Sequence, residues 1–328
     1  MSALLPVASH LGLDVHTDGD PVDPKLATGL LSVQDTFSQW WPSMFNMIKI
    51  IAPVMQSGPD EETRGTGCFF SGGVDSFFSV LKNRDRVSHL IFVVGFDIDP
   101  DDGVLVERAT RSARDSAQAL NKPLIEVRTN IAELSRGRID WGFHHHGAAL
   151  AAVGHALAEH LSEVIIPASY HQADLIPWGS HPAVDHLWSS SDLTFSHDGV
   201  EFTRPEKVAV IAESVVALDH LRVCWKNPGG AFNCGRCEKC LRTMINLKLV
   251  GALERCRTLP DELRVRDVAR LEVGHGGDRF AYQNVRALRD HSGGWALSLA
   301  LRVAMGRSRL HVAGSQIRQR FDRMRKAG

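Results

Sequence analysis

The chain has 328 residues, of which 44% are hydrophobic and 23% are charged, and these fractions exclude a disordered protein. Its 37 basic and 38 acidic residues give a net charge of -1, which excludes a broad basic surface for non-specific nucleic-acid binding. The length predicts one large domain with additions, or two domains.

The N-terminal sequence MSALLPVASHLGLDVHTDGD has neither the basic start nor the apolar core of a secretory signal. Apolar runs such as LIFVVGF are too short to span a bilayer. We therefore expect a soluble cytoplasmic protein without a membrane partner. In that compartment the six cysteines favour metal binding or catalysis over disulfides.

In chain order, residues 1–60 form a mixed N-terminal extension, with a predicted helix up to Pro42 and a predicted strand in FNMIKIIAPVM. Strand-like and helix-like segments then alternate through residues 61–260, which predicts βαβ units and a mostly parallel sheet. Residues 261–328 are expected to form a helical, basic C-terminal tail. The predicted fold class is therefore α/β, with a Rossmann-like parallel sheet.

A glycine loop follows the first strand of this alternating region, in the stretch CFFSGGVDSFFSVLK. Adjacent glycines let backbone N–H groups turn inward, and the start of the next helix adds its dipole. Ser71 and Ser76 add hydroxyl donors, and Asp75 can cap the helix or hold Mg²⁺. An ordinary strand-to-helix turn is the simpler alternative. The loop has neither the Walker spacing nor the GxGxxG pattern.

The string SGGVDS between a strand and a helix resembles the signature of the PP-loop ATP pyrophosphatase superfamily, whose members are adenine nucleotide alpha hydrolase-like (HUP-type) proteins. The resemblance implies that the loop grips the pyrophosphate of ATP while a substrate is adenylated. It also places adenine near Phe96, at the end of the next strand, although Phe96 suits an ordinary core equally well. The implied ATP-binding residues share the loop and this strand end: Ser71, Gly72, Gly73, Asp75, Ser76 and Phe96.

Four cysteines follow the spacing C-x9-C-x2-C-x2-C in residues 224–240: Cys224, Cys234, Cys237 and Cys240. Cysteines in such knuckles bind a metal tetrahedrally, and four thiolates leave no open position, which predicts a structural Zn²⁺. An iron–sulfur cluster is the main alternative, and unmetallated cysteines are the other. The remaining two, Cys68 and Cys256, are expected to be structural.

The glycine loop and the four cysteines, in this order, resemble 7-cyano-7-deazaguanine synthase and its relatives over about residues 67–245. In this resemblance Asp174 falls at the acidic position of a substrate loop, and Thr203 and Glu206 begin a helix with a capping box. The substrate-facing segments differ, with HHHG and YHQADLIPWGSHPAVDHLW in place of the family's residues. The resemblance therefore implies the ATP chemistry and leaves the acceptor open.

The resemblance implies an ATP-dependent, AMP- and pyrophosphate-forming C–N ligase with Mg²⁺ and Zn²⁺. The predicted catalytic residues are Asp75, Asp174 and Lys207, although Lys207 also suits an exposed helix position. The predicted acceptor is a small-molecule or carrier-bound carboxylate or amide. One candidate binding residue is His146 of the HHHG segment, for which a solvated histidine at a helix start is the simpler alternative. The others follow a predicted buried strand at its carboxyl end, where open α/β sheets bind ligands, with a polar surface loop as the alternative: Ser169, Tyr170, Trp178 and His181.

Two other functions stay open at this point. One is an ATP-dependent sulfurtransferase acting on tRNA or a small molecule, for which only Cys68 and Cys256 are spare. The other is a nucleotide-binding module without catalysis.

The basic tail suggests an acidic partner, either a carrier protein or RNA, and a solvated helix face is its simpler explanation. A homodimer is also compatible with the sequence. The tail's basic residues outnumber its acidic residues: Arg302, Arg307, Arg309, Arg318, Arg320, Arg323, Arg325 and Lys326, against Asp322 in the last stretch.

Overall fold

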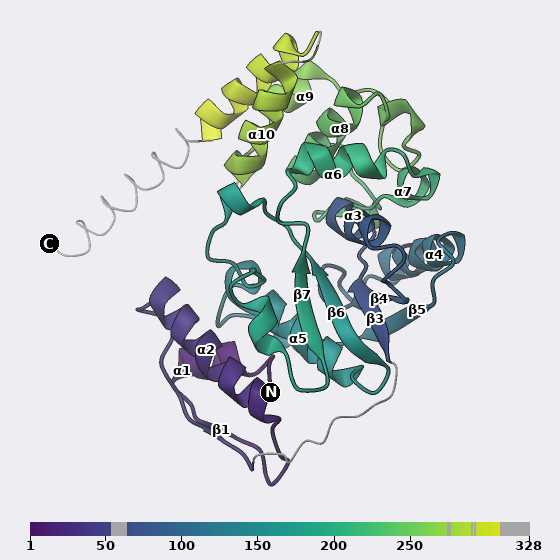
Figure 1. The fold of residues 1–328 in the computed structure, drawn as a ribbon. Helices are drawn as coiled ribbons and strands as arrows, with labels where there is room; N and C mark the ends of the chain where they lie inside the picture. The colour runs from purple at the N-terminus through teal and green to yellow at the C-terminus, as the bar shows by residue number, and fades with distance from the viewer. Residues whose placement is uncertain (54–63, 274–276, 290, 292, 309–328) are drawn as a thin grey trace, which may run out of the picture. The chain divides into compact units, whose positions relative to one another are not determined.

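A computed structural model describes residues 1–53, 64–273, 277–289, 291 and 293–308 (Figure 1). Contacts divide the chain into two compact units, residues 1–202 and 203–328. This division differs from the expected one of 1–60, 61–260 and 261–328, because the N-terminal extension packs into the first unit and the chain changes unit after Phe202. Most of the basic tail, from Arg309 onward, lies outside the described residues.

The first unit contains a five-stranded, entirely parallel sheet, so the α/β prediction is confirmed. Its strand order is β5-β4-β3-β6-β7, with Cys68 of β3 in register with Leu90 of β4 and Ile165 of β6. The strands are β3 Gly65–Phe69, β4 His89–Val94, β5 Leu124–Arg128, β6 Leu161–Pro167 and β7 Thr194–Asp198.

Helices cover both faces of this sheet (Figure 1). Side chains alternate along β7, and Phe195 packs under Gly154 of the fifth helix, while the neighbouring Ser196 points to the opposite face. The aliphatic and small residues of these helices therefore bury both sides of the strands, as expected for a parallel sheet. The helices are α3 Val74–Lys82, α4 Gly103–Ala119 and α5 His146–Ala156.

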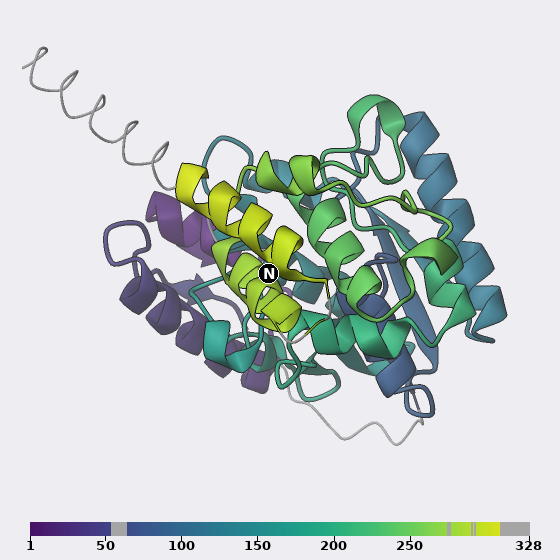
Figure 2. The same cartoon turned by 90° about the horizontal axis from the view of Figure 1, so that it is seen from above.

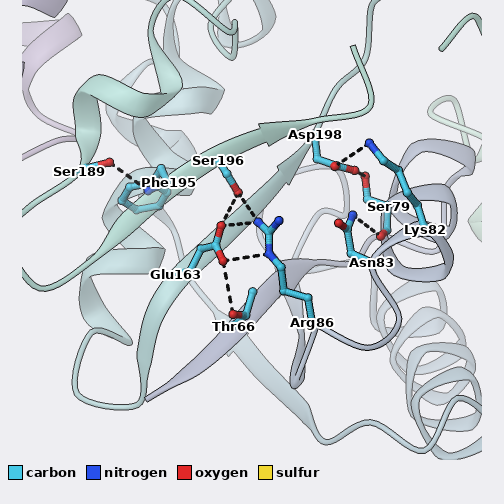
Figure 3. Close-up of polar contacts among 10 residues, drawn as sticks. All are labelled: Thr66, Ser79, Lys82, Asn83, Arg86, Glu163, Ser189, Phe195, Ser196 and Asp198. Carbon is cyan, nitrogen blue, oxygen red and sulfur yellow. Dashed lines mark hydrogen bonds and ion pairs between the residues drawn. The ribbon is translucent and has the colours of Figure 1, made fainter. Parts of the chain in front are cut away.

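Polar contacts fasten α3 and the turn after it to the sheet (Figure 3). Ser79 Oγ donates to Asp198 Oδ2 at 2.7 Å, and Lys82 Nζ donates to Asp198 Oδ1 at 3.1 Å. Arg86, after the helix, forms a two-point ion pair with Glu163 of β6. These contacts fix the direction of α3, and with it the loop at its N-terminal end.

The N-terminal extension completes the core on the α5 side of the sheet. Leu30 and Phe37 of α2 are buried with Trp188 and Phe195. The strand expected in FNMIKIIAPVM is only two residues long, since it pairs with a single short partner. The elements are α1 Leu5–Leu11, β1 Val15–His16, α2 Pro24–Trp40 and β2 Ile50–Ile51.

Short helical turns connect the larger elements of the first unit. A π-helical turn, η2, precedes α5 and begins where Asp140 Oδ1 accepts from Phe143 N at 2.7 Å. Such turns often occur at functional sites. The turns are η1 Ile131–Leu134, η2 Trp141–His145, η3 Gln172–Asp174 and η4 Asp185–Trp188.

The second unit is helical in the described residues. The predicted capping box is confirmed, because Thr203 N donates to Glu206 Oε2 at 2.7 Å at the start of α6. Residues 295–308 form a helix beside α10 (Figure 1 and Figure 2). The other elements are α6 Arg204–Ile211, α7 Val215–His220, η5 Pro228–Gly230, α8 Glu238–Leu249, η6 Leu253–Arg255, α9 Val265–Ala269 and α10 Gly277–Arg289.

Of the helices in the described parts of the chain, none is both long enough and apolar enough to cross a membrane.

Candidate functional site

The glycine loop lies at the point where the strand order reverses, between strands added on one side of β3 and strands added on the other. From β3 the chain continues outward through β4 and β5, and then returns to the other side of β3 for β6 and β7. Open α/β sheets bind ligands at the carboxyl ends of the strands that flank such a switch point. The loop 71–73 follows β3 directly and therefore begins at this position.

The loop has the backbone shape of an anion-binding turn. Gly72 adopts φ +74°, a left-handed conformation that favours glycine. Gly73 is the N-cap of α3 and has no side chain with which to cap the helix. A helix N-terminus of this kind attracts phosphate through its dipole and its N–H groups.

The two loop serines are held within this turn. Ser71 Oγ accepts from Gly73 N at 3.3 Å, and Ser76 Oγ donates to Gly73 O at 3.0 Å. The two hydroxyl oxygens lie 3.5 Å apart. Asp75, in the first turn of α3, is half-buried. Five predicted ATP-binding residues therefore lie on one strand-to-helix connection: Ser71, Gly72, Gly73, Asp75 and Ser76.

Aromatic rings gather at the same edge of the sheet. Phe96, just beyond β4, lies 5.2 Å from the ring of Trp141, and Tyr170, just beyond β6, lies 5.7 Å from Trp178. The ring of His146 lies between the two tryptophans, 6.3 Å from Trp141 and 5.5 Å from Trp178. Phe96, His146, Tyr170 and Trp178, all predicted from sequence, therefore belong to one aromatic cluster.

A close backbone approach holds His146 against the loop that carries Trp178. A Cβ atom on Gly147 would lie 1.8 Å from the carbonyl oxygen of Gly179, so only glycine fits at this contact. This packing sets the first turn of α5 directly against the residue after Trp178. The contact between Gly147 and Gly179 thus fixes the neighbouring His146 and Trp178 relative to each other.

His146 is kept neutral by its surroundings. Burial lowers the pKa of His146, against the opposing effects of Asp185, Asp97 and the backbone at Trp141 and Gly142. Its Nδ1 is buried and has no hydrogen-bond partner among the described residues. This nitrogen faces the Gly179 loop, where a Cβ atom on Gly179 would lie 2.7 Å from it.

His144 and His145 have structural positions, unlike the solvated positions that a simple helix start would give them. Both are buried, and burial lowers the pKa of each. His145 Nε2 lies 2.8 Å from the carbonyl oxygen of Ala3, and the ring of His144 packs edge-on at 4.6 Å from Trp41. The π-helical turn accounts for this difference, because it directs successive histidines into the N-terminal layer.

Sequence reasoning missed a buried Asp–His pair beside this cluster. Asp185 is completely buried, and its Oδ2 lies 2.7 Å from His197 Nδ1. His181, a predicted substrate residue, donates its backbone N–H to Asp185 Oδ1 at 3.1 Å. No strand was predicted from the sequence for residues 194–198. Their alternating pattern TFSHD would have placed His197 on the same face as Phe195, where a buried histidine requires a partner.

The remaining predicted residues of the first unit are Ser169, Asp174 and His181. Ser169 is exposed just after β6, and Asp174 is half-buried in the turn η3. The His181 ring packs 4.9 Å from Trp40 of the N-terminal layer, and its Nδ1 accepts from Ala183 N at 3.0 Å. The contacts of its ring therefore give His181 a structural role at the rim of the site.

Lys207 belongs to the second unit, in α6. Only 2% of this residue is exposed, so the alternative of an exposed helix lysine is wrong. A buried ammonium group needs anionic or hydrogen-bonding partners, because desolvation penalises the charge.

The four predicted metal ligands come together in the second unit. The sulfur atoms of Cys224, Cys234, Cys237 and Cys240 all lie within 4.8 Å of one another. The Sγ–Sγ distances are 3.9 Å for Cys224–Cys237 and 4.0 Å for Cys234–Cys240. A tetrahedral zinc site with Zn–S bonds of about 2.3 Å places its sulfurs about 3.8 Å apart. The cluster can therefore hold a metal such as zinc.

Backbone N–H groups and one asparagine shape this cysteine cluster. The N–H of Asn227 donates to Cys224 Sγ at 3.3 Å, and that of Cys237 to Cys234 Sγ at 3.2 Å, which stabilises thiolates. Asn233, which the sequence analysis missed, accepts from Cys224 N at 3.1 Å and donates to Leu221 O at 2.8 Å. A hydrogen bond from Cys240 lowers the pKa of Cys237 to about 5.

The two other cysteines are buried side chains outside this cluster. Burial raises the pKa of Cys68 well above its ordinary value, and Cys256 lies 3.6 Å from Thr258 Oγ1. A reactive thiol needs a lowered pKa and access to solvent. The structure therefore supports the structural role expected for Cys68.

Comparisons with protein-family models, with curated proteins and with solved structures find no match to this chain.

Proposed function

We propose that this protein is an ATP-dependent ligase of the PP-loop ATP pyrophosphatase type. In this proposal a carboxylate or amide oxygen of the acceptor attacks the α-phosphorus of ATP, and pyrophosphate leaves. Ammonia or an amine then attacks the activated carbon, and AMP leaves. The observation that carries the proposal is the glycine loop, with its left-handed Gly72 and glycine N-cap, at the switch point of a parallel sheet.

Each residue of the loop has a defined task in this proposal. The N–H groups of the first turn of α3 would hold the leaving pyrophosphate. The Ser71 and Ser76 hydroxyls would join them by exchanging their present hydrogen bonds to Gly73 for bonds to phosphate oxygens. Asp75 offers a carboxylate close to these groups, and we assign to it and to Asp174 the binding of Mg²⁺. When bound, Mg²⁺ supplies positive charge to the phosphate oxygens.

The aromatic cluster is assigned to the adenine and the acceptor. Phe96 follows the strand next to the glycine loop, which suits stacking on adenine. Tyr170, Trp178 and His146 would bind a flat or polar acceptor, and the neutral His146 would accept a proton from the attacking amine. Zn²⁺ in the four-cysteine cluster has a structural task, because four thiolates fill its coordination sphere.

The sulfurtransferase alternative gains no support from the spare cysteines. Both Cys68 and Cys256 are buried, and burial raises the pKa of Cys68, which opposes thiolate formation. A nucleotide-binding module that does not turn over ATP would use the same loop geometry. Product analysis separates this alternative from the ligase.

The test is to incubate the purified full chain with ATP, Mg²⁺ and a pooled small-molecule extract, and to quantify AMP, ADP, phosphate and pyrophosphate. AMP and pyrophosphate in equal amounts are expected from the wild-type chain. They should disappear in Asp75→Ala but persist in Asp115→Ala, which removes an exposed carboxylate from α4. Release of ADP and phosphate, or intact bound ATP without turnover, would overturn the ligase proposal. Unchanged turnover in Asp75→Ala would remove the role given to the loop.

A further inference from the structure

A cavity of about 520 Å³ lies between α10 and the helix 295–308 of the second unit. Both views show these two helices side by side (Figure 1 and Figure 2). The volume falls in the range of small-molecule sites, about 300–1,000 Å³. Neither the glycine loop nor the four cysteines contribute to it.

Three arginines surround this cavity, Arg286 and Arg289 from α10 and Arg302 from the facing helix. All three are exposed, and no acidic residue lines the cavity. Within the described residues, these arginines form no ion pair, and the acidic residue of α10, Asp278, lies beside Arg279 instead. Guanidinium groups around a cavity favour an anion, and their planar shape suits phosphate in particular.

The same cavity offers apolar and aromatic surface next to the arginines. Tyr282, half-exposed, lies one turn before Arg286 on α10, and Val285 and Met305 are buried side chains of the lining. An exposed aromatic ring beside arginines is the combination with which proteins stack bases and hold the backbone of single-stranded nucleic acid.

We propose that this cavity binds a nucleotide unit, with the phosphate on Arg286, Arg289 and Arg302 and the base against Tyr282. The site is separate from the proposed ATP loop and does not depend on the ligase function. The aromatic and apolar lining favours a nucleotide over an acidic peptide, which would need the positive charges alone. The nucleotide is either free or part of an RNA strand, and the experiment separates these two sources.

The experiment measures fluorescence anisotropy of a short labelled oligocytidylate RNA with the full, zinc-loaded chain. No ATP or ATP analogue is present, because a free nucleotide would compete for the proposed cavity. Free CMP and an unlabelled oligoglutamate peptide are tested as competitors. We expect the RNA to bind, with an affinity that falls steeply with salt, by about 0.7 in log Kd per log unit of salt for each phosphate contact.

Arg286→Gln/Arg289→Gln should weaken RNA binding by about tenfold for each arginine removed, and should reduce the salt dependence. The matched control is Arg266→Gln/Arg270→Gln, which removes the same charge from exposed positions at α9 outside the cavity and should bind as wild type does. Gly306→Leu keeps every charge. Its Cβ meets open space at the cavity lining, so it should keep the fold and block the site.

Competition by CMP with the same variant pattern would show that a free nucleotide suffices. Strand binding that CMP does not displace would assign the site to RNA, and both results support the proposal. Equal losses in the two arginine pairs, an unaffected Gly306→Leu variant, stronger competition by oligoglutamate than by nucleotides, or absence of binding to both RNA and CMP would overturn it.

Discussion

The side chain of His197 is oriented by Asp185, whose Oδ2 lies 2.7 Å from the imidazole Nδ1 in the interior of the first unit. The same carboxylate accepts from Ser180 Oγ at 2.7 Å and from His181 N at 3.1 Å. A buried carboxylate at this position selects the tautomer with the proton on Nδ1, which leaves Nε2 of His197 as the basic nitrogen. His197 lies next to the carboxyl end of β7, on the face of the sheet that α5 covers.

Asp185→Asn is expected to destabilise the protein by about 2–3 kcal/mol. The amide has one acceptor oxygen in place of the two that now receive three hydrogen bonds, and its NH₂ group would face donors inside the core. The measurement is urea unfolding, followed by tryptophan fluorescence. Asp192→Asn serves as the control, because its carboxylate is partly exposed and 4.0 Å from Arg64, so its loss should change stability by less than about 0.5 kcal/mol. Equal effects of the two substitutions would contradict the structural importance of Asp185.

The parts of the site that the sequence predicted are those whose residues lie close together in the chain. The glycine loop runs from Ser71 to Ser76, and four cysteines fall within residues 224–240, so local spacing was enough to identify both. The parallel sheet followed from the alternation of apolar strands and amphipathic helices. For the loop and the cysteines, one short window of sequence contains all the interacting groups, whereas the sheet was predicted from a pattern repeated along the chain.

The parts that the sequence did not predict depend on contacts between distant segments. Asp185 and His197 are paired by packing of a turn against β7, and neither residue carries a motif. His145 meets the carbonyl of Ala3 across 142 positions of the chain. Periodicity also could not place the π-helical turn at Trp141–His145, because a single wider turn shifts which histidine faces the core.

The stability of the first unit is expected to fall as the pH drops below the ordinary histidine pKa of 6.5. Burial lowers the pKa of five histidines in the folded state, so the unfolded chain binds more protons in the window just below 6.5. Folding is therefore most favourable above that value and weakens as the pH falls through the window. Urea midpoints measured between about pH 8 and pH 5 test this sign. The histidines are His144, His145, His146, His155 and His181.

His145→Gln should flatten this pH dependence in part. Glutamine does not titrate, and its amide can still donate to the carbonyl oxygen of Ala3. The matched control is His160→Gln at an exposed position, which should leave the slope as it is in the wild type. An identical slope in the His145 variant and the wild type would show that this imidazole does not contribute to the loss of stability.

Gly72→Ala is expected to weaken ATP binding through the backbone of the loop. Alanine at φ +74° costs about 1–2 kcal/mol, which the loop can relieve only by turning its N–H groups away. Gly137→Ala is the matched control, because Gly137 has φ +72° and open space around its Cβ position. Both variants should lose similar stability, whereas calorimetry should show weaker ATP binding only for Gly72→Ala. Equal ATP affinity in the two variants would count against a phosphate-binding loop.

Cys237→Ser is expected to remove the metal and unfold the second unit. Cys237 is the N-cap of α8, and its sulfur contacts the sulfurs of the other three cysteines. The loss of its thiolate therefore affects both the metal coordination and the start of a buried helix. Elemental analysis should find about one zinc per wild-type chain and almost none in the variant, with a matching loss of helical circular dichroism. Cys256→Ser provides the control, because this buried cysteine lies outside the cluster and the variant should keep its metal. If the wild type contains iron and absorbs visible light, the four cysteines hold an iron–sulfur cluster and not zinc. Equal metal content in the two variants would show that Cys237 is not a ligand.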